Sequence, residues 1–263
     1  MNRLVLPPSA GAPARKHSAP VLLVIAHGSR DPRHAATVQA LVHRAGELRP
    51  GLRVETAFLD FTLPSVPGVL DRLAAEGVRE VVALPLLLTR AFHAKADIPA
   101  VLRQAPPSLD IRQGEVLGPS PLLLSAVERR LYEAGLTPGD KSTTGVVLAS
   151  AGSTDPEAIA AIAETARELR RTGWCSVRPA FASASLPRTQ DAVSALRAEP
   201  GVRRVAVAPY VIAPGRLPDR IAAGATGADA LAAVLGPAPE LARLLVERYD
   251  GAQATGRTAA RTA

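Results

Sequence analysis

The sequence repeats a strand and the turn that follows it, and the second copy lacks a histidine. Residues 22–32 read LLVIAHGSRDP, and residues 146–156, 124 positions further on, read VVLASAGSTDP. Three later segments recur in the same order, at offsets between 118 and 124. Ordered matches at a nearly constant offset indicate an internal duplication. Because the Gly-Ser-x-Asp-Pro stretch survives in both copies, we interpret it as a turn. His27, which becomes Ala151, is then the residue that carries chemistry.

Short apolar runs alternate with longer amphipathic stretches in both copies. The first copy predicts strands at residues 21–26, 53–59, 80–88 and 110–116, separated by helices at 31–48, 65–76, 95–104 and 119–133. The second copy starts in the same way, with a strand at 145–150 and a helix at 155–171. Continuous apolar strands separated by helices are typical of a parallel sheet covered on both faces. The sequence predicts an α/β protein of two similar half-chains, each a parallel sheet flanked by helices, which face each other across a cleft.

Composition places the ends of the two copies. Residues 1–19 are rich in Pro, Ala and Ser and lack the apolar stretch of a signal peptide, so we expect a disordered leader on a cytoplasmic protein. Residues 20–136 form the first predicted domain, and residues 145–250 form its degenerate duplicate. Residues 251–263 are low in complexity and basic, which predicts a disordered tail.

The composition narrows the classes of function. A single cysteine, Cys175, leaves no disulfide framework and no thiolate cluster within one chain. No apolar run approaches the length of about 20 residues that crosses a bilayer, so we expect no membrane partner. The net charge of +7 fits a solvated basic surface, a nucleic-acid ligand or a polyanionic small molecule. Scattered cations and only 3% aromatic residues argue against nucleic acid.

Two of the five histidines follow predicted strands at their carboxyl ends. His27 closes the first strand, and His93 lies in the loop after the third. Ligands of open α/β sheets bind at that edge, in the loops that leave the strands. The alternative is that both are hydrogen-bonding turn residues. The counterpart of His93 is Leu217, so the second copy has lost this imidazole as well.

The other histidines have simpler explanations. His17 lies in the predicted leader, and His34 and His43 lie in the first predicted helix, where a packed or solvated imidazole is usual. His34 fits this explanation less well, because the first turn of that helix faces the strand ends.

A pair of imidazoles in one cleft suits a borderline divalent metal such as Fe²⁺, Co²⁺, Ni²⁺ or Zn²⁺. Asp60, just past the second predicted strand, could add a carboxylate from the same rim. Its counterpart is Ser183, so this acid is also lost. The alternative role for Asp60 is to cap the helix that follows.

These residues together resemble the sirohydrochlorin chelatase family, the type II chelatases that insert Fe²⁺ or Co²⁺ into a modified tetrapyrrole. The resemblance extends from about residue 21 to residue 249. Its motifs are AHGSRDP at 26–32, AFLD at 57–60 with a proline at 64, LPLLL at 84–88, HAKADIP at 93–99 and LGP at 117–119. It implies the long form of the family, in which two copies are fused and one keeps the metal histidines.

The resemblance also implies roles for particular residues. His27 and His93 correspond to the metal-binding pair, and an imidazole there would also accept protons. Asp60 stands where the family usually has Glu, and its shorter arm puts a direct catalytic role in doubt. The family usually has an acidic residue shortly after the second histidine, but Ala94, Lys95 and Ala96 stand there in this sequence, so that acid is absent and a cation has appeared. The substrate carries eight carboxylates, and the candidates to hold them are Ser29, Arg30, Arg90, Lys95 and, from the second half, Arg216.

The resemblance implies no cofactor beyond the substrate metal, and the duplication within one chain favours a monomer. Iron and cobalt accept the same ligands. We favour iron, because siroheme is the more general need, and keep cobalt and cobalamin as the alternative. A carrier that binds the tetrapyrrole or the metal without turnover is a further alternative. A histidine phosphatase is disfavoured, because it needs Arg at the position of Ala26.

Overall fold

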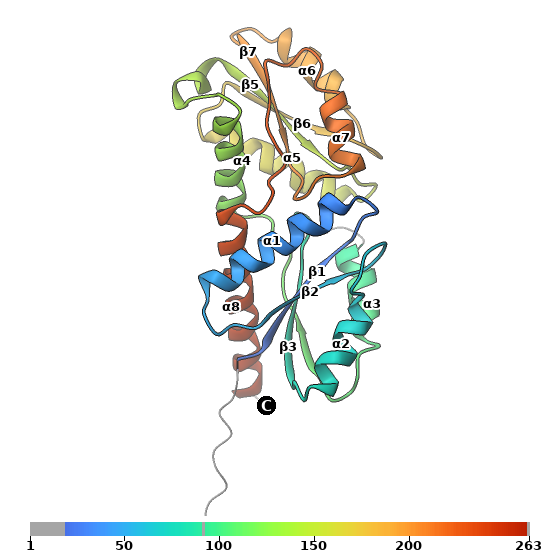
Figure 1. Ribbon diagram of the computed structural model, residues 1–263. Helices are drawn as coiled ribbons and strands as arrows, with labels where there is room; N and C mark the ends of the chain where they lie inside the picture. Colours follow the sequence, from blue (N-terminus) through green and yellow to red (C-terminus); the bar gives the residue numbers. More distant parts are fainter. Residues whose placement is uncertain (1–18, 91–92, 262–263) are drawn as a thin grey trace, which may run out of the picture.

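The computed structural model describes residues 19–90 and 93–261, without the side chains of residues 93, 94 and 255–261 (Figure 1). It has two four-stranded parallel sheets, with strand orders β2-β1-β3-β4 and β6-β5-β7-β8. Helices flank both sheets, and a cleft lies between the two halves. The predicted fold class is confirmed. Residues 1–18 of the predicted leader lie outside the described residues.

The first copy supplies β1 (Val21–Ala26), α1 (Pro32–Leu48), β2 (Val54–Phe58), α2 (Val66–Ala75), β3 (Glu80–Pro85), a π-helix (His93–Asp97), α3 (Ile98–Leu102), β4 (Asp110–Gln113) and α4 (Pro121–Glu133). A 3₁₀-helix (Pro138–Thr143) leads to the second copy. That copy supplies β5 (Thr144–Ser150), α5 (Pro156–Arg171), β6 (Ser176–Phe181), α6 (Thr189–Arg197), β7 (Arg204–Pro209), α7 (Arg216–Ala223), β8 (Ala230–Leu231) and α8 (Pro239–Arg261).

The central strands β1 and β5 are buried along their whole length, as their continuous apolar sequences predict. In the first half, α2 and α3 cover one face of the sheet. The opposite face packs into a larger apolar cluster that continues into the second half. The strand β3 ends at Pro85, three residues before the predicted end. Residues 86–88, which the sequence predicted as part of this strand, line the cleft instead.

The last helix of each copy packs on the other half. α4 follows the first sheet in sequence but packs against α5 and β7, whereas α8 follows the second sheet and packs against α1, β3 and β4 (Figure 1). The sequence boundaries at 136 and 145 therefore separate the two copies but not the two packed bodies.

Glu128 anchors α4 to the second half. Its carboxylate accepts hydrogen bonds from the Lys141 ammonium, the Thr172 hydroxyl and the indole N–H of Trp174, the last at 3.1 Å. The ring of Tyr132 stacks on Trp174, with centroids 6.4 Å apart. These contacts hold α4 against the second half, although α4 belongs to the first copy in sequence.

Two side chains anchor α8 to the first half. The Arg248 guanidinium donates to the carbonyl oxygens of Val116 and Leu117 at 2.9 and 2.8 Å. The buried Tyr249 hydroxyl donates to the carbonyl oxygen of Pro20 at 2.6 Å. The helix runs on to residue 261, so residues 251–261 are helical instead of forming the predicted disordered tail. Alanine, the strongest helix former, recurs in this stretch and favours the continuation.

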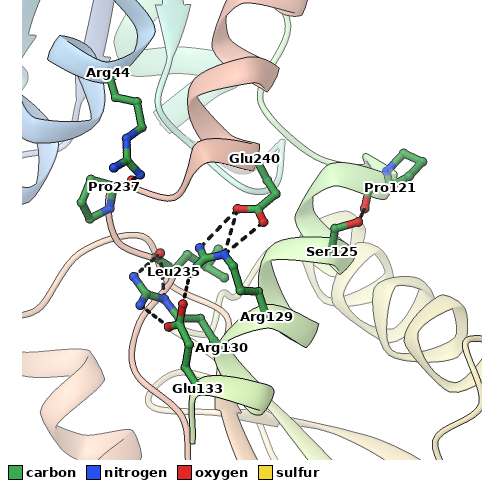
Figure 2. Close-up of polar contacts among 9 residues, drawn as sticks. All are labelled: Arg44, Pro121, Ser125, Arg129, Arg130, Glu133, Leu235, Pro237 and Glu240. Carbon is green, nitrogen blue, oxygen red and sulfur yellow. Dashed lines mark hydrogen bonds and ion pairs between the residues drawn. The ribbon is translucent and has the colours of Figure 1, made fainter. Parts of the chain in front are cut away.

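Figure 2 shows where α4 and α8 meet; we call them the exchanged helices, because each packs on the half to which it does not belong in sequence. The Arg129 guanidinium of α4 pairs with Glu240 in the first turn of α8, with Nε 3.0 Å from Oε1. Arg130 donates twice to the Leu235 carbonyl oxygen, at 3.1 and 2.8 Å. The contact between α4 and the start of α8 is therefore stabilised by charged hydrogen bonds in addition to the apolar core.

Within the described part of the chain, the helices are all too short or too polar to cross a membrane.

Candidate functional site

The Gly-Ser-x-Asp-Pro turn has the same backbone in both halves. Gly28 and Gly152 have φ values of 94° and 95°, in the left-handed region that favours glycine. A Cβ on Gly28 would lie 1.8 Å from the Asp60 carbonyl oxygen, and one on Gly152 would lie 1.9 Å from that of Ser183. Glycine therefore lets the turn after the first strand of each half approach the turn after the second.

The serine and the aspartate of this motif fix the turn by hydrogen bonds. The Ser29 hydroxyl accepts from the backbone N–H of Asp31 at 3.1 Å, and Ser153 accepts from Asp155 at 3.0 Å. The two aspartates cap α1 and α5 by accepting a backbone N–H from the first helical turn. The interpretation of the motif as a turn is confirmed. The residue before the glycine plays no part in these bonds.

A cleft of about 470 Å³ lies between the halves at the carboxyl ends of the strands. The first half contributes the turn after β1 and residues 86–89, and the second contributes residues 150–153 and 210–218. Apolar side chains supply much of the lining, including Val38, Ile159, Ile162 and Phe181. An apolar cleft with a few polar groups is the usual form of a small-molecule site.

His27 enters this cleft from the end of β1. Its side chain is half-buried, its Nδ1 lies 3.2 Å from the Gly28 carbonyl oxygen, and its ring centroid is 6.1 Å from that of Phe61. Ala151, the equivalent residue of the second half, lies on the opposite wall of the cleft. The cleft therefore has an imidazole on one wall and a methyl group at the matching place on the other.

His34 also lines the cleft, although the sequence favoured a structural role for it. Its ring centroid is 6.3 Å from that of Phe58, and its Nδ1 is buried with no hydrogen-bond partner in the described structure. Burial, and then the nearby His27, lower the pKa of His34 below its ordinary value of 6.5. The neutral form is therefore favoured. The signal for this residue was its place in the first turn of the helix after the strand end.

Of the other two predicted metal ligands, only Asp60 has a side chain that the structure describes. Asp60 is exposed and lies outside the cleft lining, and its backbone N–H donates to the His27 carbonyl oxygen at 2.9 Å. Ser65, and not Asp60, caps α2. His93 opens the π-helix, but its side chain lies outside the described residues.

Among the described residues, no three His, Cys, Asp or Glu side chains gather as a metal site. The predicted set of His27, Asp60 and His93 needs the His93 side chain and stays a prediction.

The predicted substrate-binding residues divide into two groups. Lys95 forms ion pairs with carboxylates of the second half, and Arg90 pairs with Glu115 away from this cleft. Ser29 and the exposed Arg216 line the cleft from opposite halves. The Arg30 guanidinium lies over the Phe61 ring, 5.2 Å from its centroid. Two of the predicted cations, Lys95 and Arg90, are therefore paired with protein carboxylates in the structure.

The fold and the cleft define the class of protein, a chelatase-like α/β protein of two halves with parallel sheets. The family model CbiX matches residues 21–134 and again residues 145–252. The chain belongs to the CbiX family, in the full-length form with two CbiX-like halves.

The relatives extend this result. The chain is 29% identical over 209 residues to a sirohydrochlorin cobaltochelatase of Priestia megaterium, over 76% of this chain and 66% of that protein. It is 26% identical over 204 residues to a sirohydrochlorin ferrochelatase of the same organism, over 76% of each chain. SirB from Bacillus subtilis with Fe³⁺ has the same fold, with a TM-score of 0.78 at 23% identity over 91% of this chain and 98% of that one.

Proposed function

We propose that this protein inserts a divalent metal into sirohydrochlorin, with the metal held by His27 and His93 of the first half. The observation that carries the proposal is the position of His27. It lines the cleft from a turn whose backbone the second half reproduces without the histidine. The names of the two relatives, a cobaltochelatase and a ferrochelatase of the same substrate, support the reaction and leave the metal open.

Metal insertion needs a ligand for the incoming ion and an acceptor for two pyrrole protons. A neutral imidazole can do both. It first coordinates the metal, and it then accepts a proton as the nitrogens of the macrocycle replace it on the metal. The cleft would also bend the macrocycle and so expose the nitrogen lone pairs to the metal. His34, whose pKa is lowered by burial, supplies a further imidazole on the same wall.

The carboxylates of the substrate need cations or hydrogen-bond donors around the cleft. Ser29 and Arg216 line it from the two halves, and Arg30 follows Ser29 in the chain and lies over the Phe61 ring. We assign these three to the substrate carboxylates. Lys95 would bind a substrate carboxylate only after that carboxylate replaced its present partners in the second half. Iron is our favoured metal, and no resident cofactor is required.

The test is a chelation assay with purified protein, sirohydrochlorin and Fe²⁺ or Co²⁺, followed by absorbance. We expect the wild-type protein to accelerate insertion over the spontaneous rate, and His27→Ala and His93→Ala to lose most of that acceleration. His43→Ala is the matched control, because His43 is exposed on α1 and pairs with Glu47. Acceleration that survives both substitutions would refute the assignment. Tight tetrapyrrole binding without acceleration would instead identify a carrier.

A further inference from the structure

Ion pairs connect the halves at two places beside the cleft. Arg33 in the first turn of α1 pairs with Asp219 of α7, with Nη2 3.1 Å from Oδ2. The Lys95 ammonium of the π-helix lies 2.6 Å from Glu157 Oε2 and 2.9 Å from Asp155 Oδ2, both at the start of α5. Each pair therefore joins one element of the first half to one of the second.

The duplication relates these two pairs to each other. An offset of 124 residues carries Arg33 onto Glu157 and Lys95 onto Asp219. Each contact therefore joins position 33, or its equivalent 157, to position 95, or its equivalent 219. In the first contact the residue on α1 is the cation, and in the second the equivalent residue on α5 is the anion. The position is kept and the polarity is reversed.

This reversal makes the faces of the two halves different. The first half presents two cations, Arg33 and Lys95, and the second half presents two anions at the equivalent positions, Glu157 and Asp219. If either face met a copy of itself in the same geometry, these two positions would bring like charges together, although Asp31 and its equivalent Asp155 place a carboxylate beside them in both halves. Repulsion of that kind excludes a wrong partner. At positions 33 and 95, and at their equivalents 157 and 219, the charges of the two halves are therefore complementary.

The pairs lie where the cleft walls approach each other. A Cβ on Gly215, the residue before α7, would come within 3.8 Å of the Ser29 hydroxyl on the other wall. The exchanged helices α4 and α8 lie on the left of Figure 1, whereas α3 and α7 lie on the right. The halves are thus joined by packed helices on one side and by exposed ion pairs on the other.

Exposed ion pairs are weak and are screened by salt. The side chains of Arg33 and Asp219 are 55% and 60% exposed, those of Lys95 and Glu157 are 37% and 63% exposed, and that of Asp155 is 21% exposed. A contact of this kind opens readily, in contrast to the apolar core around α4 and α8. We propose that the two charge-reversed pairs form a clasp that closes the cleft walls on each other, and that ligands enter the cleft when it opens.

The clasp can be tested by hydrogen exchange of the cleft walls, residues 86–89 and 211–217, read by mass spectrometry on the full chain. Arg33→Glu with Glu157→Arg mismatches both contacts and keeps the net charge of +7. An exposed pair is worth a factor of about two to five, so we expect exchange in both segments to rise at least that much. Arg33→Glu with Asp219→Arg has the same net charge and restores the first contact with inverted polarity. Its exchange should return to the wild-type rate.

A control separates the clasp from any loss of a surface charge pair. Arg178→Glu breaks the pair between Arg178 and Glu199, 2.9 Å apart within the second half, and should leave exchange of the cleft walls unchanged. High salt should speed exchange in the wild-type protein by screening the attraction, and slow it in the mismatched variant by screening the repulsion. The clasp is refuted if the mismatched variant exchanges at the wild-type rate, or if the restored variant exchanges as fast as the mismatched one. No metal or tetrapyrrole is present, so the result does not depend on the proposed reaction.

Discussion

The Tyr249 hydroxyl donates a hydrogen bond to the carbonyl oxygen of Pro20 and so joins the last helix of the chain to the start of its first strand. This bond lies inside the exchanged packing, because Tyr249 belongs to the second copy and Pro20 to the first. The side chain is fully buried. The two copies therefore cannot be treated as separate folding units, since each contributes a helix to the core of the other.

Substitutions at Tyr249 should show how much this exchange contributes to stability. Tyr249→Phe removes the hydrogen bond alone and should lower the free energy of unfolding by about 1 kcal/mol. Tyr249→Ala also leaves a cavity and should cost about 3 to 5 kcal/mol. Urea unfolding measures both. A Tyr249→Ala variant as stable as the wild type would show that α8 does not hold the first half.

Gly28→Ala should be strongly destabilising, because the new Cβ would meet the Asp60 carbonyl oxygen in a left-handed backbone. We expect a loss above about 3 kcal/mol in thermal or urea unfolding. Gly152→Ala should behave alike, since its Cβ meets Ser183 in the same way. Gly51→Ala is the control, because Gly51 has a φ of 85° with open space around it and should lose only about 1 to 2 kcal/mol. Equal losses at Gly28 and Gly51 would contradict the close approach.

The ion pair of Glu128 predicts a pH dependence of stability. Burial alone would raise the pKa of Glu128, but its bonds to Lys141, Thr172 and Trp174 hold this pKa below the ordinary value of 4.5. The native state then binds fewer protons than the unfolded state. The stabilisation is present above the unfolded pKa and is lost as the pH falls through the lowered value.

Glu128→Gln should therefore cost about 1 to 3 kcal/mol at pH 7 and progressively less below pH of about 4.5. Urea unfolding of both proteins at several pH values measures the difference. A difference that does not shrink in acid would show that the charge of Glu128 does not anchor α4.

The second half should accept a metal site if its lost imidazoles are restored. Ala151 and Leu217 stand at the positions of His27 and His93, and both line the cleft on a wall with the same turn. Ala151→His with Leu217→His should raise the bound Co²⁺ from one to two ions per chain in a titration. Ala151→Gln with Leu217→Gln is the matched control and should stay at one. A stoichiometry of one in the double-histidine variant would show that the turn alone does not place the ligands.

The repeat and the apolar strands were sufficient to predict the two parallel sheets and the cleft, because strand burial and the Gly-Ser-x-Asp-Pro turn are local properties. The exchange of α4 and α8 was not predictable in this way. An amphipathic sequence pattern shows that a helix buries one face but not which sheet it covers, and the choice depends on tertiary contacts such as Glu128 with Trp174. Residues 251–261 were predicted as a disordered tail from their low complexity, whereas α8 continues through them.

The candidate site was predicted in part. His27 could be found because the copy lacks it. His34 was given a structural role because a histidine within a helix is usually packed or solvated, and its place in the first helical turn after the strand end was the one signal against that role. The cations were the least predictable. Lys95 reads as a substrate ligand from its position at the rim, and only the folded structure reveals the carboxylates of Asp155 and Glu157 beside it.

The central claim is that His27 and His93 together hold the substrate metal in the first half. X-ray absorption at the cobalt edge of the Co²⁺-loaded protein counts the imidazole ligands directly. We predict two in the wild type and in His43→Ala, and one fewer in each of His27→Ala and His93→Ala. An unchanged number of imidazole ligands in the His27 and His93 variants would contradict the account.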